Sequence, residues 1–155
     1  MLTHEIINYN EHLPIRLFIQ RIGSIEKHWH HSMELLLVLS GEVTVTVEED
    51  SYQLGENDII LINPNQIHET SSKDAVLAVL QVRLSMYSLA GISQNSSFIC
   101  NSVSSNDKTH FHNIRAIMAK LILLDADSQE QRESDLLIVA YAYMLMYELQ
   151  KNFSV

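Results

Sequence analysis

The stretch His28-Trp29-His30-His31-Ser32-Met33-Glu34 carries three of the 8 histidines in this chain of 155 residues, followed by a carboxylate. Side chains alternate between two faces along an extended strand, so His28 and His30 share one face while Trp29 and His31 share the other. If His68 approaches from a neighbouring strand, three imidazoles and one carboxylate converge. Such a set suits a divalent first-row metal such as Zn, Fe, Mn, Ni or Cu. The alternative is a polar patch beside a barrel that binds nothing.

Short strand-like runs flank this stretch on both sides. In residues 42–47 valine alternates with polar residues, whereas residues 35–39 are apolar throughout, as in a strand that is covered on both faces. Gly23 ends the first run, and Ser40-Gly41 marks a tight turn. The predicted strands are residues 15–22, 35–39, 42–47, 52–54, 58–62, 67–70 and 76–84. Such short strands with turn residues between them are typical of a sandwich or barrel, so the chain is expected to be all-β up to about residue 84.

The pattern becomes helical in the last third of the chain. Residues 85–107 are rich in serine and predict a connecting segment, with a short helical turn at residues 86–89. Apolar residues then recur every three or four positions and predict a helix from residue 108 that breaks at residues 125–127. Ser128 and Gln131 have the spacing of a capping box at the start of a second helix. The apolar stripe of that helix comprises Leu136, Ala140, Tyr143 and Tyr147, with Leu137, Met144 and Leu145 beside it. The stripe is either a self-association face or packs entirely on the barrel and the first helix.

Composition limits the classes of function. The formal net charge is −9, and the 10 Lys and Arg residues are scattered singly, so this chain is a poor candidate for contacting nucleic acid by itself. The single cysteine cannot form an internal disulfide, which fits a cytoplasmic protein. No apolar run is long enough for a transmembrane helix, and the N-terminus has no features of a secretory signal.

The spacing His28-x-His30-x3-Glu34-x6-Gly41 resembles the first motif of the cupin family. The second motif is looser, with Asn57-Asp58, Asn65 and His68 at its expected positions and Ser72 in place of its final asparagine. The resemblance implies a mainly β fold, namely a cupin-like barrel (double-stranded β-helix, or jelly roll), followed here by two C-terminal α-helices.

A narrower resemblance extends beyond these motifs. Residues 28–30, 33–41 and 58–68, together with the helical tail, are similar to the N-terminal sensor domain of AraC-family transcription regulators. This implies an N-terminal arm and cupin-like barrel at residues 1–84, a connecting segment at 85–107 and a helical pair for homodimerisation at 108–155. It also implies that the helix-turn-helix half, which would contact DNA, is absent from this chain.

By this resemblance the barrel senses a small polar metabolite, such as a sugar, with no catalytic residues and no cofactor expected. Residues 1–14, the N-terminal arm, are a candidate lid. The candidate ligand-binding residues are His28, Trp29, His30, Glu34, His68, Arg16, Gln81 and Arg83. For Trp29 the alternative role is packing, and for the two arginines it is exposure to solvent.

A metal-dependent cupin enzyme is the second hypothesis, for example an oxygenase, isomerase or epimerase. In it His28, His30, Glu34 and His68 would bind a divalent transition metal such as Zn, Fe, Mn or Ni. The sequence shows no clear additional base for such chemistry. A third hypothesis is a structural or protein-interaction barrel that binds no ligand.

Overall fold

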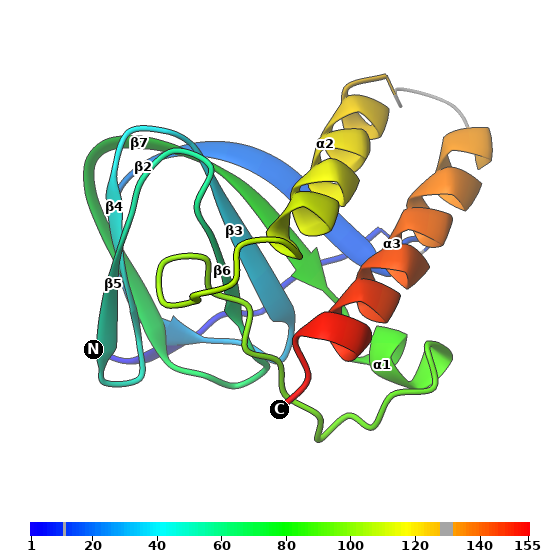
Figure 1. Cartoon of the computed structure of the whole chain (residues 1–155), viewed down its shortest axis with the longest axis horizontal. Coiled ribbons are helices and arrows are strands. Elements are labelled where there is room, and N and C mark those ends of the chain that lie inside the picture. The colour runs from blue at the N-terminus through cyan, green and yellow to red at the C-terminus, as the bar shows by residue number, and fades with distance from the viewer. Residues whose placement is uncertain (11, 128–131) are drawn as a thin grey trace.

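The computed structural model describes residues 1–10, 12–127 and 132–155. Among these residues, seven strands form one sheet that curls into a barrel, and three helices lie beside it (Figure 1). The strands are β1 (Thr3–His4), β2 (Ile15–Trp29), β3 (Met33–Ser40), β4 (Val43–Val47), β5 (Asp50–Leu54), β6 (Ile59–Ile62) and β7 (His68–Val82). The helices are α1 (Ser85–Leu89), α2 (Phe111–Asp127) and α3 (Arg132–Asn152). The predicted mainly β barrel with C-terminal helices is confirmed.

β7 connects the two halves of the sheet. It pairs antiparallel with β2 from Val82 back to His68. On its other edge, its first residues pair with β4 and its last residues pair with β3. The start of β7 therefore lies beside the end of β2, where His68 is opposite His28. This pairing brings together histidines that are far apart in the sequence.

Two predicted strand boundaries are wrong. Gly23 lies inside β2, where a register shift between Ile22 and Ser24 lets the strand continue as a bulge. The strands predicted at residues 67–70 and 76–84 are one strand, β7. Its polar middle stays extended because Ser71 pairs with Ser24 on one side and with Thr44 on the other. Both strands stay extended in these segments because their backbones pair with neighbouring strands. The hydrophobic pattern of the sequence does not indicate such pairing.

The helices agree with the prediction except at the two ends of α2, which begins at Phe111 and not at residue 108. α1 confirms the helical turn expected at residues 86–89. α2 continues to Asp127, so the predicted break at residues 125–127 is wrong. The proposed capping box at residues 128–131 lies outside the described residues.

The apolar core has two parts, one on each face of the sheet. Met33, Leu35 and Leu37 of β3 belong to the cluster that packs against the helices. Leu36 and Val38, which alternate with them, belong to the cluster inside the barrel. β3 is therefore covered on both faces, as its continuous apolar sequence indicates. Because Glu34 shares a face with Leu36, its carboxylate is directed into the barrel.

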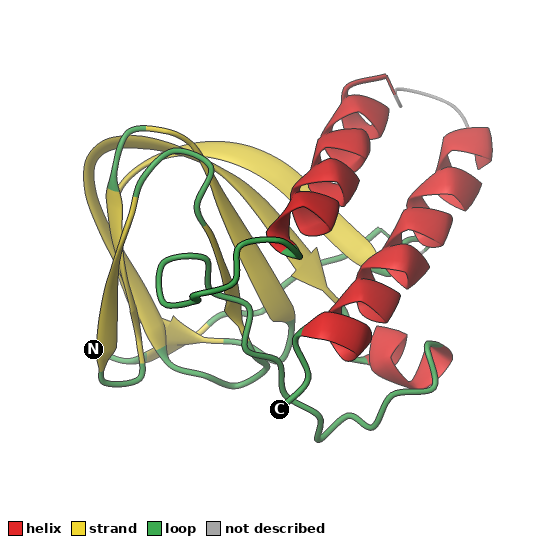
Figure 2. Ribbon diagram, viewed as in Figure 1, coloured by secondary structure: helices red, strands yellow, loops and turns green. Residues whose placement is uncertain are grey.

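The helices gather on one side of the barrel, with α2 beside α3 (Figure 2). Both helices bury an apolar face in the core, including Ile114 and Met118 of α2 and Leu145 and Leu149 of α3. The Nε of Arg115 donates a 2.7 Å hydrogen bond to the carbonyl oxygen of Asn57, which ties α2 to the turn before β6. None of the helices in the described residues is long and apolar enough to cross a membrane.

Candidate functional site

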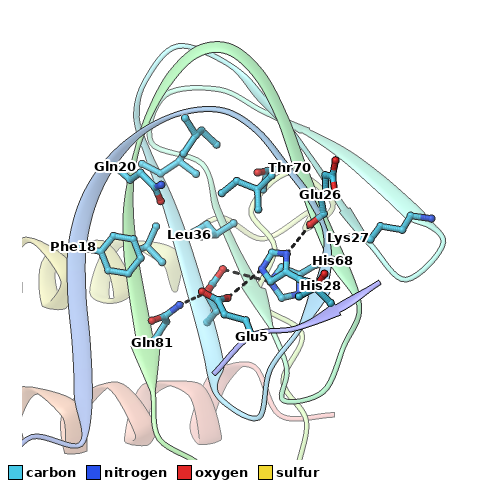
Figure 3. A pocket seen from close by; sticks show the side chains of 16 residues that line it. Glu5, Phe18, Gln20, Glu26, Lys27, His28, Leu36, His68, Thr70 and Gln81 are labelled. Atoms are coloured by element: carbon cyan, nitrogen blue, oxygen red, sulfur yellow. Dashed lines mark hydrogen bonds and ion pairs between the residues drawn. The ribbon is translucent and has the colours of Figure 1, made fainter. Parts of the chain in front are cut away.

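A cavity of about 340 Å³ opens into the barrel. Its walls come from the inward faces of β2, β3 and β7, and residues of the N-terminal arm lie at its edge (Figure 3). One wall is apolar and includes Phe18, Leu36 and Val79, whereas the other end carries imidazole, carboxylate and amide groups. The lining residues are Thr3, Glu5, Phe18, Gln20, Ile22, Ile25, Glu26, Lys27, His28, Glu34, Leu36, His68, Thr70, Leu77, Val79 and Gln81.

Three histidines meet near the polar end of this cavity, and two of them, His28 and His68, line it. One ring nitrogen from each of His28, His30 and His68 lies within 4.8 Å of the others. The ring centroids of His28 and His68 are 4.1 Å apart, and those of His30 and His68 are 4.9 Å apart. His30 and His68 are almost completely buried. The structure thus brings together the three imidazoles that the sequence analysis selected.

Each of these histidines is held by a backbone carbonyl group two residues away. Nδ1 of His28 contacts the backbone oxygen of Glu26, and Nδ1 of His30 contacts the backbone oxygen of Ser32. Nδ1 of His68 contacts the backbone oxygen of Gln66, and all three distances are 2.8–3.0 Å. A carbonyl oxygen only accepts hydrogen bonds, so each Nδ1 carries the proton. Nε2 is then the nitrogen left free to accept a proton or bind a metal.

Each free Nε2 faces a carboxylate. Nε2 of His30 is 3.2 Å from Glu34 and that of His68 is 3.8 Å from Glu34, while Nε2 of His28 is 3.5 Å from Glu5. The Nε2 atoms of His30 and His68 are buried and make no hydrogen bond with any described residue. A lone pair that faces a carboxylate is repelled unless a proton or a cation lies between them. The donor set therefore fits a divalent transition metal.

Glu34 is the buried carboxylate of the site. Its Oε2 accepts a 2.8 Å hydrogen bond from Nε2 of Gln81. Burial favours the neutral acid, but contact with His30, the charge of His68 and the Gln81 hydrogen bond together lower the pKa of Glu34 below its usual value. Glu34 is therefore an anion at neutral pH.

The two buried histidines respond differently to this anion. Burial lowers the pKa of His68 to about 4, and the charge of Glu34 offsets only part of that effect. Burial also acts to lower the pKa of His30, but the closer contact with Glu34 outweighs it, so the pKa of His30 is raised. At neutral pH His68 is thus an uncharged imidazole, the form that binds metals.

The other predicted site residues differ in position. Gln81 lines the cavity, and its Oε1 accepts a 3.4 Å hydrogen bond from Nη1 of Arg16, which is itself exposed. Trp29 does not line the cavity, because strand alternation turns it to the outer face, where its ring stacks on His4 at 4.1 Å. Arg83 lines a separate hollow beneath the arm, stacks over the ring of Tyr9 and donates to the carbonyl oxygen of Asn10.

Phe18 and Glu5 are two of the lining residues that the sequence analysis did not select. Phe18 could have been found, because strand alternation places it on the same face as Arg16 and Gln20. Glu5 gave no signal, because it reaches the cavity through the parallel pairing of β1 with the distant end of β2. No local sequence pattern reports such a pairing.

The sequence profile of the AraC-like ligand binding domain matches residues 20–146, which include most of the barrel, all of α2 and most of α3. The chain belongs to the AraC-like ligand-binding domain family. This confirms the family resemblance found in the sequence. A comparison with curated proteins finds no match to this AraC-like domain.

The similar solved structures are distant in sequence. A conserved protein of unknown function from Streptococcus pyogenes is 20% identical, with a TM-score of 0.40 over 44% of this chain and 62% of that one. A cupin superfamily protein from Desulfitobacterium hafniense is 15% identical, with a TM-score of 0.45 over 50% of this chain and 72% of that one. Bacillus subtilis oxalate decarboxylase is 13% identical, with a TM-score of 0.44 over 53% of this chain and 30% of that one. This AraC-like domain therefore spans less than two thirds of the length of the S. pyogenes protein.

Proposed function

We propose that this AraC-like domain is the effector-binding and dimerisation part of a cytoplasmic transcription regulator, and that a small polar metabolite binds in the barrel. The observation that carries the proposal is the cavity, which combines an apolar wall with a buried, hydrogen-bonding end. Ligand sites commonly have this composition, and about 340 Å³ suits a compact molecule. The barrel and arm at residues 1–84 would bind the effector, and the helical pair at residues 108–155 would form the dimer. Residues 85–107 would connect the barrel to the helical pair. With a net charge of −9, the domain leaves contact with DNA to another part of the regulator.

The lining favours a sugar or a related polyhydroxylated effector. The carboxylate of Glu34 and the amides of Gln20 and Gln81 offer acceptors and donors for hydroxyl groups. Phe18 and Leu36 present apolar surface to the C–H face of such a molecule. Among the predicted ligand-binding residues, His28, Glu34, His68 and Gln81 line the cavity and are retained in the proposal. Arg16 would act through Gln81, whose amide it contacts.

The proposal includes a divalent transition metal held by His28, His30 and His68, with Glu34 beside them. Its support is the arrangement of three Nε2 atoms that face carboxylates and, at His30 and His68, lack a hydrogen-bond partner among the described residues. A bound divalent ion would supply a Lewis acid for an oxygen atom of the effector. The backbone carbonyl groups would keep each imidazole in the tautomer that binds metal.

The exposed stripe of α3 supports a dimer formed with a second copy. Leu136, Tyr143 and Tyr147 are 77%, 41% and 58% exposed, and Ala140 between them is also exposed. Their spacing of four, three and four residues is that of a coiled-coil seam. Leu137 and Met144 widen the exposed face, whereas Leu145 is buried in the core of the protomer. A second α3 helix is the occupant that matches the heptad spacing of this stripe.

Thermal shift tests effector binding. Purified protein is screened against pentoses, hexoses and their acids, with and without a chelator, and one class is expected to raise Tm. A ligand at a hundred times its Kd stabilises the folded state by about 2.7 kcal/mol. Phe18→Ala is expected to weaken binding at least tenfold. Ile19→Ala is the matched control, because Ile19 is the next residue of β2 and points outward with 54% of its surface exposed. A Phe18→Ala variant that binds as tightly as the control would refute the placement of the ligand.

The metal-dependent enzyme remains the second candidate function, because the same three histidines would serve it. The two functions differ in the fate of the ligand. A sensor returns the bound sugar chemically unchanged after prolonged incubation with metal-loaded protein, whereas an enzyme converts it. NMR spectroscopy of the recovered ligand separates them, because it also detects isomerised or epimerised products, whose mass equals that of the substrate.

A further inference from the structure

The N-terminal arm brings an additional carboxylate to the histidine cluster. Thr3 and His4 of β1 pair with His28 and Trp29 at the end of β2, and the amide of Glu5 donates a 2.9 Å hydrogen bond to the carbonyl oxygen of Trp29. Alternation along the arm then directs Thr3 and Glu5 into the cavity, while His4 stacks on the outward face of Trp29. Figure 3 shows Glu5, the residue that follows β1, beside His28.

The position of Glu5 relative to His28 resembles that of Glu34 relative to His30. Oε2 of Glu5 is 3.5 Å from Nε2 of His28, and Oε2 of Glu34 is 3.2 Å from Nε2 of His30. In both pairs Nδ1 of the imidazole is already bonded to a backbone carbonyl group, so the carboxylate faces the free nitrogen. Glu34 is buried, whereas Glu5 is 44% exposed at the mouth of the cavity. The cluster is therefore flanked by one fixed carboxylate and one carried by the arm.

We infer that Glu5 is a metal-binding residue of this domain, so that metal bound by the three histidines fastens the N-terminal arm across the cavity. The inference rests on the metal site of the proposed function. A carboxylate oxygen is a suitable ligand for an ion already held by imidazoles. Since Glu5 comes from the arm, its bond to the metal exists only while the arm is docked, and binding and docking must strengthen each other equally.

The arm is also attached to the barrel at a second place, which does not involve Glu5 or the metal. The hydroxyl groups of Tyr9 and Ser32 are hydrogen-bonded, and Arg83 stacks over the ring of Tyr9 at 4.6 Å. Arg83 also donates a 3.1 Å hydrogen bond to the carbonyl oxygen of Asn10. The arm therefore stays attached at residues 9–10 when the end of the arm is released. The segment that responds to metal is the short pairing at Thr3–His4 and the following residue.

Two measurements on Glu5→Gln test this inference. Zn²⁺ affinity is measured by competition with a chromophoric chelator, and hydrogen exchange is followed at the backbone amide groups of residues 3–5. In the wild-type protein Zn²⁺ is expected to slow exchange at these residues. Glu5→Gln is expected to lower Zn²⁺ affinity at least about tenfold and to abolish the slowing. Glu49→Gln is the control, because it removes the same charge from the exposed turn between β4 and β5, outside the cavity lining.

The outcomes separate this inference from the proposed function. Wild-type affinity and protection retained in Glu5→Gln overturn the role of Glu5 and leave the three-histidine site standing. An equal loss in Glu5→Gln and Glu49→Gln also overturns it, because general electrostatics would then account for the effect. If the wild-type protein binds no Zn²⁺, the metal site and the role of Glu5 fail together. The effector screen, run with and without chelator, tests the sensor function separately, and that function fails only if no sugar class raises Tm in either condition.

Discussion

Replacement of Gly41 by alanine is expected to destabilise the fold through two separate effects. Gly41 has φ of +78°, a conformation that costs an L-residue about 1–2 kcal/mol. A Cβ atom there would also lie 2.7 Å from the carbonyl oxygen of Asp74 and 3.2 Å from Cα of Ala75. Both are backbone atoms of β7 and cannot rotate away, so the overlap adds about 1–3 kcal/mol. The total expected loss for Gly41→Ala is about 2–5 kcal/mol.

Gly91→Ala separates the two effects. Gly91 has φ of +73°, but a Cβ atom there meets no described atom within 4 Å. It is therefore expected to lose only the conformational part, about 1–2 kcal/mol. Urea unfolding followed by circular dichroism, at one protein concentration, measures both variants. The free energy of unfolding falls by about 2 kcal/mol per molar urea. The urea midpoint of Gly41→Ala should therefore lie about 0.5–1.5 M below that of Gly91→Ala. Equal midpoints would refute the argument that the contact of Gly41 with β7 requires glycine.

Two further predictions concern charge and assembly. The pKa of His68 is lowered to about 4 in the folded protein from an ordinary 6.5, so the unfolded chain binds more protons between these pH values. The free energy of unfolding of metal-free protein should therefore fall as pH drops through this window, by up to about 3 kcal/mol at about 1.4 kcal/mol per pH unit. His68→Asn should make the free energy of unfolding less dependent on pH in this window. An unchanged slope would mean that groups other than His68 cause the pH dependence. Tyr147→Glu should convert the dimer to a monomer in analytical ultracentrifugation, while Ala119→Glu on the exposed face of α2 should leave it intact. A monomeric wild-type protein at tens of micromolar would contradict the dimer.

The part of the site on the barrel strands was predictable because strand geometry is local. Period-two alternation separates His28 and His30 from Trp29, and the continuous apolar run after Glu34 indicates a strand covered on both faces. The barrel places the half-buried Trp29 on its outer face and directs Glu34 inward, as alternation requires. The direction of each side chain follows from the sequence once the strand is recognised.

The contacts between strands were not predictable in the same way. The long β7 was divided into two predicted strands because its middle is polar, yet pairing with β2 and β4 keeps it extended. That same pairing places His68 opposite His28. Likewise, α2 continues through Asp125, although two acidic residues close together predicted a break. Tertiary contacts outweigh local preference at such positions.

The sequence by itself determined the barrel, the family and the residue types of the site, because motif spacing, alternation and helical period are properties of neighbouring residues. Only the tertiary structure decided which groups meet. It brought one ring nitrogen of each of three imidazoles within 4.8 Å of the others, turned their Nε2 atoms toward carboxylates and added Glu5, which no local sequence pattern indicates. The physical reason is that register between strands depends on backbone hydrogen bonds over long separations, and these leave little trace in any short stretch of sequence.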